Sequence, residues 1–335
     1  ALSPTAGPLA GGTSVVITSA PIVKGRYQFY ARQRNVTGVS QCSIVYADYH
    51  LSGTPMVTQW LTTVANETIT LPFRTTFEYH LLVDWGDGSP LALITAGDDL
   101  DATHAYATAG THTVTLMGSA GTWYFNDTGD KTKLLQVNEL GDLDWLSLSA
   151  AFFGCTNLTT FGGGDTSKVT SMYAMFKNAD QVMPATTDWN TSNVTRMESM
   201  FYGATAAEPD TSNWNTSKVI RTDYMFYNAI NANPDTSNWD MSSNTMMLGM
   251  FQLAASANPD MSAWQVGNVT TFATMFLGVT LPTATYSGLL LAIEASSALN
   301  TVPLGGGGSK YGTNAAAAHA ALVNRGWIIT DGGPE

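Results

Sequence analysis

Residues 189–204 read WNTSNVTRMESMFYGA, and this pattern returns along the chain with a period of 25 residues. Met-Phe pairs, Trp and Pro mark the period in one common register. The columns are Met175-Phe176, Met200-Phe201, Met225-Phe226, Met250-Phe251 and Met275-Phe276; Trp189, Trp214, Trp239 and Trp264; and Pro184, Pro209, Pro234 and Pro259. Several markers that share one period identify an internal repeat.

Each repeat has an apolar half and a turn-rich half. Val194, Met197 and Met200 are spaced so that a short extended piece leads into about two helical turns with one apolar side. The second half is rich in Asn, Asp, Ser, Thr and Pro, which favour turns. Such a unit cannot enclose its own apolar side chains, but stacked copies can cover one another. The repeat therefore predicts a leucine-rich-repeat-like solenoid over 138–280, with 148–155 as a degenerate first coil.

The Met, Phe and Trp columns are the predicted core. The Trp column has two interpretations, an internal ladder of packed rings or an exposed ladder that suits sugar rings. One aromatic residue per coil in a fixed register favours the internal ladder. Thr222 and Asn244 break the pattern, since other coils carry Met and Val there. The sequence predicts that the Asn244 coil is looser, or that Asn244 finds a hydrogen-bond partner.

The run from Trp189 to Ala204 resembles the BspA-like leucine-rich-repeat surface proteins, also described as the DUF285 repeat family. The resemblance covers about residues 139–280, because the order W…SNVT…M..MF.GA recurs there. It implies a surface-displayed protein of bacteria, of their phages or of some protists, engaged in binding or adhesion.

The N-terminal part carries other resemblances. The segment Val83–Ser89, with Thr103–Tyr106 and Ala109–Leu116, is similar to a PKD-type immunoglobulin-like domain over 55–137. Residues 3–17 resemble the start of an IPT/TIG domain, and 1–54 read as β-rich. At the other end, 286–295 and 315–323 predict helices, Gly305–Gly308 a flexible loop, and 326–333 a strand followed by a turn.

These segments together predict a multidomain fold. It consists of N-terminal all-β immunoglobulin-like sandwich domains (1–54 and 55–137), then a leucine-rich-repeat-like solenoid of 25-residue coils (138–280) and a helical C-terminal cap (281–335).

Charge and composition exclude several function classes. The chain has 335 residues and a net charge of −12, which disfavours nucleic acid and anionic membrane as partners. Only 12% of residues are charged, a balance common in exposed β-rich surface proteins. No apolar stretch is long enough to span a membrane, and because the chain starts at Ala1, we expect that a leader or an upstream domain precedes it. Cys42 and Cys155 are either buried thiols or one long-range disulfide.

The sequence contains no convincing catalytic or cofactor motif, and we expect no enzyme activity and no cofactor. The acidic residues of the PKD-like segment are weak calcium candidates, with turn formation as the favoured interpretation; they are Asp84, Asp87, Asp98, Asp99 and Asp101. His104 and His112 lack any zinc-ligand spacing, and Gly305–Lys310 lacks the context of a phosphate-binding loop.

Three functions remain open at this point. The first is a secreted or cell-surface adhesin whose solenoid contacts a protein or glycan on another cell. The second is a phage tail fibre, spike or capsid-decorating protein, with neighbouring virion subunits as partners. The third is the binding module of a polysaccharide hydrolase, which lacks room for a catalytic domain outside 1–54.

Overall fold

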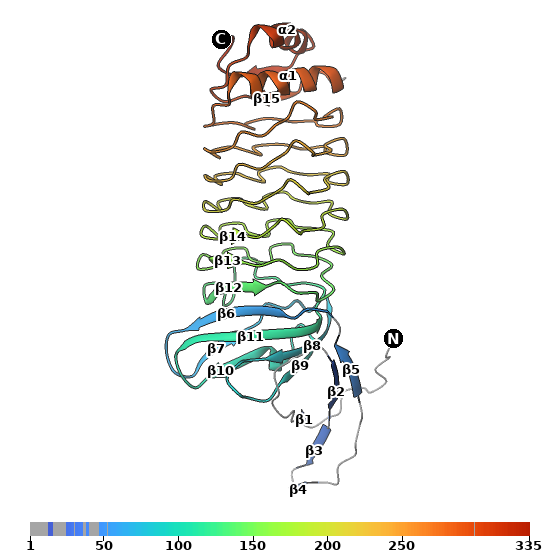
Figure 1. Ribbon diagram of the computed structural model, residues 1–335, viewed down its shortest axis with the longest axis vertical. Coiled ribbons are helices and arrows are strands. Elements are labelled where there is room, and N and C mark those ends of the chain that lie inside the picture. Colours follow the sequence, from blue (N-terminus) through green and yellow to red (C-terminus); the bar gives the residue numbers. More distant parts are fainter. Residues whose placement is uncertain are drawn as a thin grey trace.

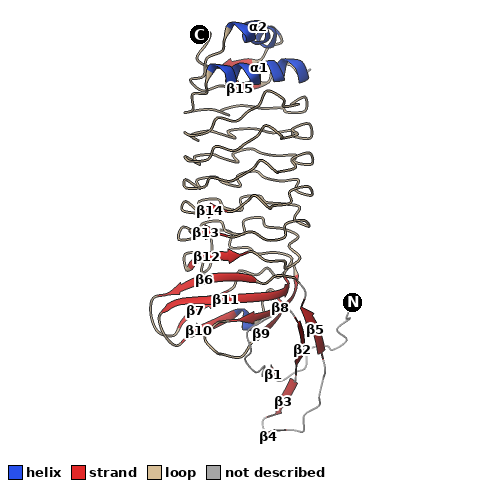
Figure 2. Ribbon diagram, in the orientation of Figure 1, coloured by secondary structure: helices blue, strands red, loops and turns tan. Residues whose placement is uncertain are grey.

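The computed structural model describes residues 53–297 and 299–335, together with five short strands closer to the N-terminus. Figure 1 shows a straight stack of repeats that leads from a β-sheet region at one end to two helices at the other. Most repeats consist of turns and loops, whereas most strands lie below them (Figure 2). We number the repeats 1 to 4 as residues 171–195, 196–220, 221–245 and 246–270, and repeat 5 begins at residue 271.

The sheet region contains one seven-stranded sheet in the order β14-β13-β12-β6-β11-β8-β9. Its strands are β6 (Met56–Thr62), β8 (Glu78–Asp84), β9 (Ala92–Ala96), β11 (Gly110–Ser119), β12 (Leu134–Glu139), β13 (Thr160–Phe161) and β14 (Met183–Pro184). A two-stranded sheet pairs β7 (Glu67–Thr70) with β10 (Thr103–Tyr106), which follows the short 3-10 helix η1 (Leu100–Ala102). The remaining strands are β1 (Thr13–Val15), β2 (Gly25–Phe29), β3 (Ala31–Asn35), β4 (Gly38–Val39) and β5 (Ala47–Leu51).

The sheet region and the repeats share one hydrophobic core. β12 pairs antiparallel with β6 and parallel with β13, so the sheet continues into the residues that precede repeat 1. A second connection involves residues outside the sheet. Thr122 forms an isolated parallel β-bridge with Ser147, and the centroid of the Trp123 ring lies 6.5 Å from that of Phe152. Residues 122–127 therefore form an extra layer at the start of the stack, which the sequence did not reveal. The predicted domain boundaries stay a prediction, but β12 crosses the one placed between 137 and 138.

Within a repeat, alternate backbone amides point to different partners. The amides of Ser199 and Phe201 donate to carbonyls of repeat 3, at 2.9 and 2.8 Å. The amides between and after them, those of Met200 and Tyr202, donate to carbonyls three residues earlier in their own repeat, both at 3.2 Å. The segment is thus a series of tight turns, each tied to the next repeat.

Two positions in each repeat hold the left-handed conformation that these turns require. The first column contains Ala150, Ala174, Ser199, Tyr224, Gly249 and Thr274, and the second contains Gly154, Asn178, Gly203, Asn228, Leu253 and Gly278; φ lies between 51° and 79° at all of them. Left-handed residues interrupt both helices and strands. The spacing of Met197, Met200 and Phe201, which resembles that of a helix, therefore arises from consecutive turns.

The predicted fold class is wrong. Residues 171–282 contain no helix, and their only strand is the two-residue β14. Contacts between successive repeats are isolated parallel bridges, such as Ser171 with Arg196 and Arg196 with Arg221, so no continuous solenoid sheet of the leucine-rich-repeat type forms. The regular secondary structure of the described chain is mostly β-sheet, with two short α-helices, and the combination of immunoglobulin-like sandwiches, such a solenoid and a helical cap is not what it adopts.

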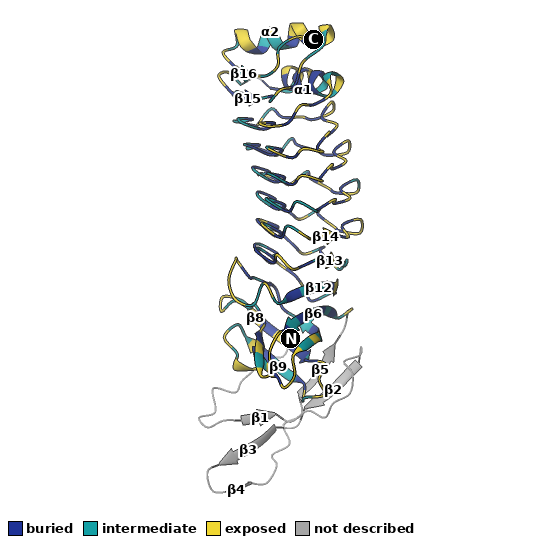
Figure 3. Ribbon diagram, turned by 90° about the vertical axis from the view of Figure 1, so that its left-hand side faces the viewer, coloured by how far each residue is buried: buried dark blue, intermediate teal, exposed yellow. Residues whose placement is uncertain are grey.

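The inner side of the stack is lined by two columns of parallel aromatic rings. Successive Phe rings from Phe176 to Phe276 lie 5.5–5.6 Å apart, with interplanar angles of 3–16°. Successive Trp rings from Trp189 to Trp264 lie 6.1–6.3 Å apart, with angles of 1–4°. Buried Thr hydroxyls between them are satisfied; for example, Thr211 donates to the Asp235 carbonyl at 2.7 Å. The interior is accordingly dark blue in Figure 3.

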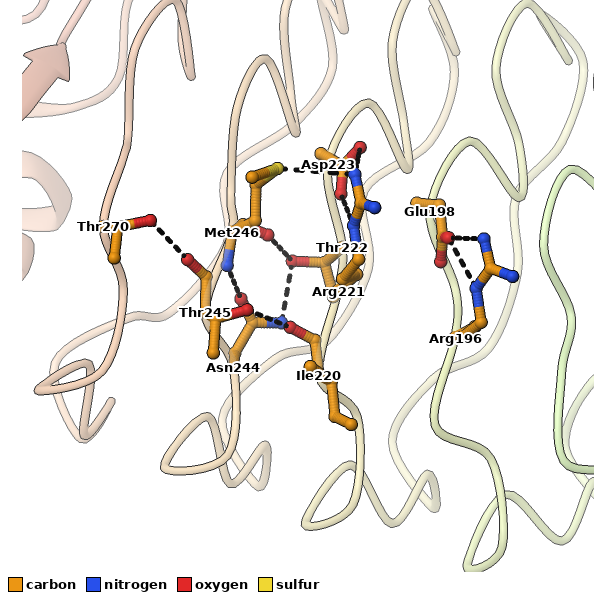
Figure 4. Close-up of polar contacts among 10 residues, drawn as sticks. All are labelled: Arg196, Glu198, Ile220, Arg221, Thr222, Asp223, Asn244, Thr245, Met246 and Thr270. Atoms are coloured by element: carbon orange, nitrogen blue, oxygen red, sulfur yellow. Dashed lines mark hydrogen bonds and ion pairs between the residues drawn. The ribbon is translucent and has the colours of Figure 1, made fainter.

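Asn244 has a hydrogen-bond partner, and that partner is the other exceptional residue. Asn244 is fully buried, and its Nδ2 donates to Thr222 Oγ1 at 3.2 Å (Figure 4). Its Oδ1 accepts from the Met246 amide at 3.0 Å. The second of the two alternatives for this residue is confirmed, because the two polar side chains that stand where other coils carry Met and Val satisfy each other.

After repeat 5 the chain forms α1 (Thr283–Ser296), β15 (Pro303–Gly305), the 3-10 helix η2 (Thr313–Ala315), α2 (Ala316–Asn324) and β16 (Ile328–Thr330). Leu304 of β15 bridges Phe272, and β15 pairs parallel with β16. The prediction of a flexible Gly305–Gly308 loop is wrong. A Cβ on Gly307 would lie 2.1 Å from the Phe276 carbonyl oxygen, so the loop is packed closely against repeat 5.

The Thr222–Asn244 contact predicts a coupled pair of substitutions. Asn244→Val alone should lower the free energy of unfolding by about 1 kcal/mol, because it removes a buried hydrogen bond. Thr222→Met alone should cost a similar amount by leaving the Asn244 amide without its partner. The double variant restores the consensus contact and should be at least as stable as the parent chain. Urea unfolding of all four proteins measures the coupling energy; additive effects would contradict the assignment.

Leu253 predicts a stabilising substitution. It holds φ of 61° where Asn178 and Asn228 stand in other repeats. Leu is poorly suited to this conformation and Asn tolerates it. Leu253→Asn should raise the free energy of unfolding by about 0.5–1 kcal/mol, and the matched reverse change, Asn228→Leu, should lower it. Thermal unfolding tests both, and destabilisation by Leu253→Asn would refute the strain argument.

Candidate functional site

Three of the calcium candidates accept hydrogen bonds from nearby backbone amides. Asp84 accepts from the Gly86 amide at 2.9 Å and Asp87 from the Ser89 amide at 3.0 Å. Asp99 accepts from the amides of Thr95 and Asp101. Neither Asp98 nor Asp101 joins them in a cluster, and within residues 53–297 and 299–335 no group of three or more His, Cys, Asp or Glu is placed to hold a metal ion.

Asp87 instead contacts His104, which stacks on Trp85. Asp87 Oδ2 lies 2.8 Å from His104 Nε2, and the His104 and Trp85 rings are 5.0 Å apart. Partial burial would raise the pKa of Asp87, but hydrogen bonds from Ser89 and His104 outweigh it and lower the pKa to about 2. The pair holds the β8–β9 connection against β10.

The structure buries all of the predicted repeat-core residues. They are Met175, Phe176, Met200, Phe201, Met225, Phe226, Met250, Phe251, Met275, Phe276, Trp189, Trp214, Trp239 and Trp264. The Trp rings are only 2–3% exposed and cover one another, so they form the internal ladder and present no face to a sugar. Cys155 is buried and forms no disulfide among the described residues, and Cys42 lies outside them.

A second set of aromatic residues lies on the outside of the same turns. We call it the tyrosine face and define it as Tyr173, Lys177, Arg196, Tyr202, Arg221, Tyr224 and Tyr227, all from the first eight positions of repeats 1 to 3. The two left-handed positions turn Met and Phe inward and leave these side chains partly or fully accessible. This face could not be predicted from the sequence, because spacing alone does not show which side of a turn is outward.

One cation and two rings of the tyrosine face contact one another in series. Lys177 Nζ lies 5.2 Å from the ring centroid of Phe153 and 4.8 Å from that of Tyr202. The Tyr202 ring stacks on Tyr227 at 4.3 Å with an interplanar angle of 14°. Burial, followed by the neighbouring Tyr227, raises the pKa of Tyr202, so its hydroxyl stays protonated at neutral pH. These contacts align Lys177, Tyr202 and Tyr227 across repeats 1 to 3.

Two Arg residues of this face pair with acids two residues later (Figure 4). Arg196 bonds to Glu198, and Arg221 Nε donates to Asp223 Oδ1 at 2.9 Å. Arg221 also reaches Met246 Sδ at 3.4 Å. The bond to Asp223 raises the pKa of Arg221. Glu198 is only 2% exposed, and its Oε2 has no hydrogen-bond partner among the described residues.

Further along the stack, the outward positions become aliphatic. Leu253 and Leu277 are 40% and 50% exposed. Leu277 lines an apolar pocket of about 470 Å³ together with Leu304 and Ile328. The outer surface of the turns thus changes from aromatic and basic in repeats 1 to 3 to apolar near β15.

The turn edge formed by the second half of each repeat has a different chemistry. Asp210, Asp235 and Asp260 each accept from the amide and hydroxyl of a Ser two residues later. Hydrogen bonds from these serines lower the pKa of all three carboxyls. We call these three residues the acidic edge.

Comparison with known proteins finds one similarity. Residues 146–264 and 206–285 match the family described as "Mycoplasma protein of unknown function, DUF285". This match confirms the DUF285 part of the resemblance over the repeats and supports a surface-repeat protein of unknown function. No curated protein and no solved structure matches. The PKD-like and IPT/TIG-like resemblances stay predictions, and most of the latter lies outside the described residues. None of the described helices is long and apolar enough to cross a membrane.

The Asp87–His104 contact predicts acid sensitivity of the sheet region. Because the folded pKa of Asp87, about 2, lies below its ordinary value of 3.8, the stabilisation is present above about pH 4 and is lost as pH falls toward 2. The difference in free energy of unfolding between the parent chain and Asp87→Asn should therefore shrink over that interval. Urea unfolding at pH 6, 4 and about 2.5 measures it; a pH-independent difference would refute the assignment.

Proposed function

We propose that this chain is a non-catalytic recognition protein, displayed at a cell or virion surface, that contacts a partner through the outward side of its repeat stack. The tyrosine face carries the proposal. Its side chains are partly or fully accessible, and Lys177, Tyr202 and Tyr227 are aligned by contacts between successive repeats.

Two further observations support recognition. Repeat arrays offer extended surfaces that suit large partners, and the aligned repeats here form a straight stack (Figure 1). The DUF285 match covers these repeats. Partners of this kind are proteins or glycans on another surface, or neighbouring subunits of an assembly.

Binding of the full chain to intact cells tests the proposal. The labelled protein should bind in a saturable manner to at least one of several bacterial and animal cell types. A Phe226→Asp variant is the control, because a charge buried in the Phe column disrupts the stack, and it should lose the binding. Equal binding by the parent chain and by this variant, or no saturable binding to any cell type, would contradict the proposal.

A further inference from the structure

We infer that the tyrosine face binds a protein, and that a carboxylate of this partner pairs with Lys177. The inference rests on the proposed recognition function and specifies which face acts and what class of partner it meets.

The residue types of this face are those of protein interfaces. Tyr and Arg are enriched in such interfaces and among the residues whose truncation costs much affinity. Tyr173, Tyr202, Tyr224 and Tyr227 stand beside Arg196 and Arg221 within three successive repeats. The acidic edge consists of Asp residues that accept hydrogen bonds from Ser side chains, and interfaces are depleted in Asp and Ser. Composition therefore favours the tyrosine face.

The Tyr202 ring does not offer the open face that a sugar needs. A sugar packs against an open aromatic face, but the Tyr202 ring has Tyr227 at 4.3 Å and Lys177 at 4.8 Å. Because these residues come from repeats 1, 2 and 3 in order, both faces of the Tyr202 ring are covered. The edge and hydroxyl of Tyr202 are what a partner meets, and they fit the mixed polar and apolar surface of a folded protein.

Lys177 gives the face its charge preference. Arg196 and Arg221 already pair with Glu198 and Asp223. Among the residues that the structure describes, Lys177 forms no ion pair and its cation contacts only rings. Contact with rings leaves the ammonium N–H groups free to donate. Covering this cation without an acceptor would be costly, so a complementary partner places a carboxylate there.

The face is also organised before binding. Stacking fixes the rings of Tyr202 and Tyr227, and Tyr224 packs against Tyr227 at a centroid distance of 5.9 Å. Side chains that are already ordered lose little conformational entropy when a partner arrives. This favours a rigid partner surface over a flexible segment that must order on binding.

The test uses the full chain and matched variants against two kinds of probe, a panel of purified extracellular-matrix and cell-surface proteins and a glycan array. Lys177→Met removes the charge but keeps most of the side chain, and Tyr227→Leu removes one ring. Lys218→Met is the matched control, because Lys218 is exposed in the other half of repeat 2, where it contacts only Asn193 Oδ1 at 2.8 Å. Thermal unfolding verifies that each variant is folded.

We expect a protein of the panel to bind, with affinity reduced about tenfold or more by Lys177→Met and by Tyr227→Leu and unchanged by Lys218→Met. Higher salt should weaken the parent chain more than Lys177→Met. If a protein binds but Lys177→Met and Tyr227→Leu have no effect, the assigned face is wrong while the recognition function stands. Binding to glycans alone would overturn the partner class only. Failure of every probe would count against recognition itself.

Discussion

The alternating direction of the backbone amides is the constraint on which the rest of the stack depends. Amides such as those of Ser199 and Phe201 donate to the next repeat, and those between them close turns within their own repeat. This alternation requires a left-handed residue at two places in every repeat, which Ser199 and Gly203 supply in repeat 2. Neither a helix nor a strand contains such residues regularly, so this hydrogen-bond pattern excludes the strand-and-helix coil of a leucine-rich repeat.

The aromatic columns follow from this backbone pattern. Because each repeat bonds to the next in a constant register, equivalent side chains lie directly above one another, and the Trp rings become parallel within 1–4°. The first residue of a column lacks the preceding repeat that the others contact. The indoles of Trp214, Trp239 and Trp264 donate to Thr carbonyls of the preceding repeat, whereas Trp189 Nε1, first in the column, has no partner among the described residues.

The sequence predicted the interior well and the backbone poorly, for one physical reason. Apolar residues that recur at a fixed period are expected to be buried. The Met, Phe and Trp columns, and the need of Asn244 for a partner, could therefore be predicted from spacing alone. Backbone conformation depends on φ, and Ala174 or Tyr224 in a left-handed conformation leaves no compositional signal. The layer at 122–127 was missed because it lies outside the period, although Trp123-Tyr124-Phe125 is as apolar as any repeat.

The tyrosine face shows why a candidate site of this kind escapes sequence analysis. Inward positions must match their neighbours above and below, so they repeat. Outward positions have no such requirement: the position of Lys177 holds Tyr202, Tyr227, Gln252 and Leu277 in the following repeats. A pattern search ranks residues by regularity and therefore selects the core. Side chains that contact a partner can vary only at positions that do not follow the repeat. The residues that depart from the period therefore specify the partner, and the residues that keep the period build the stack that holds them.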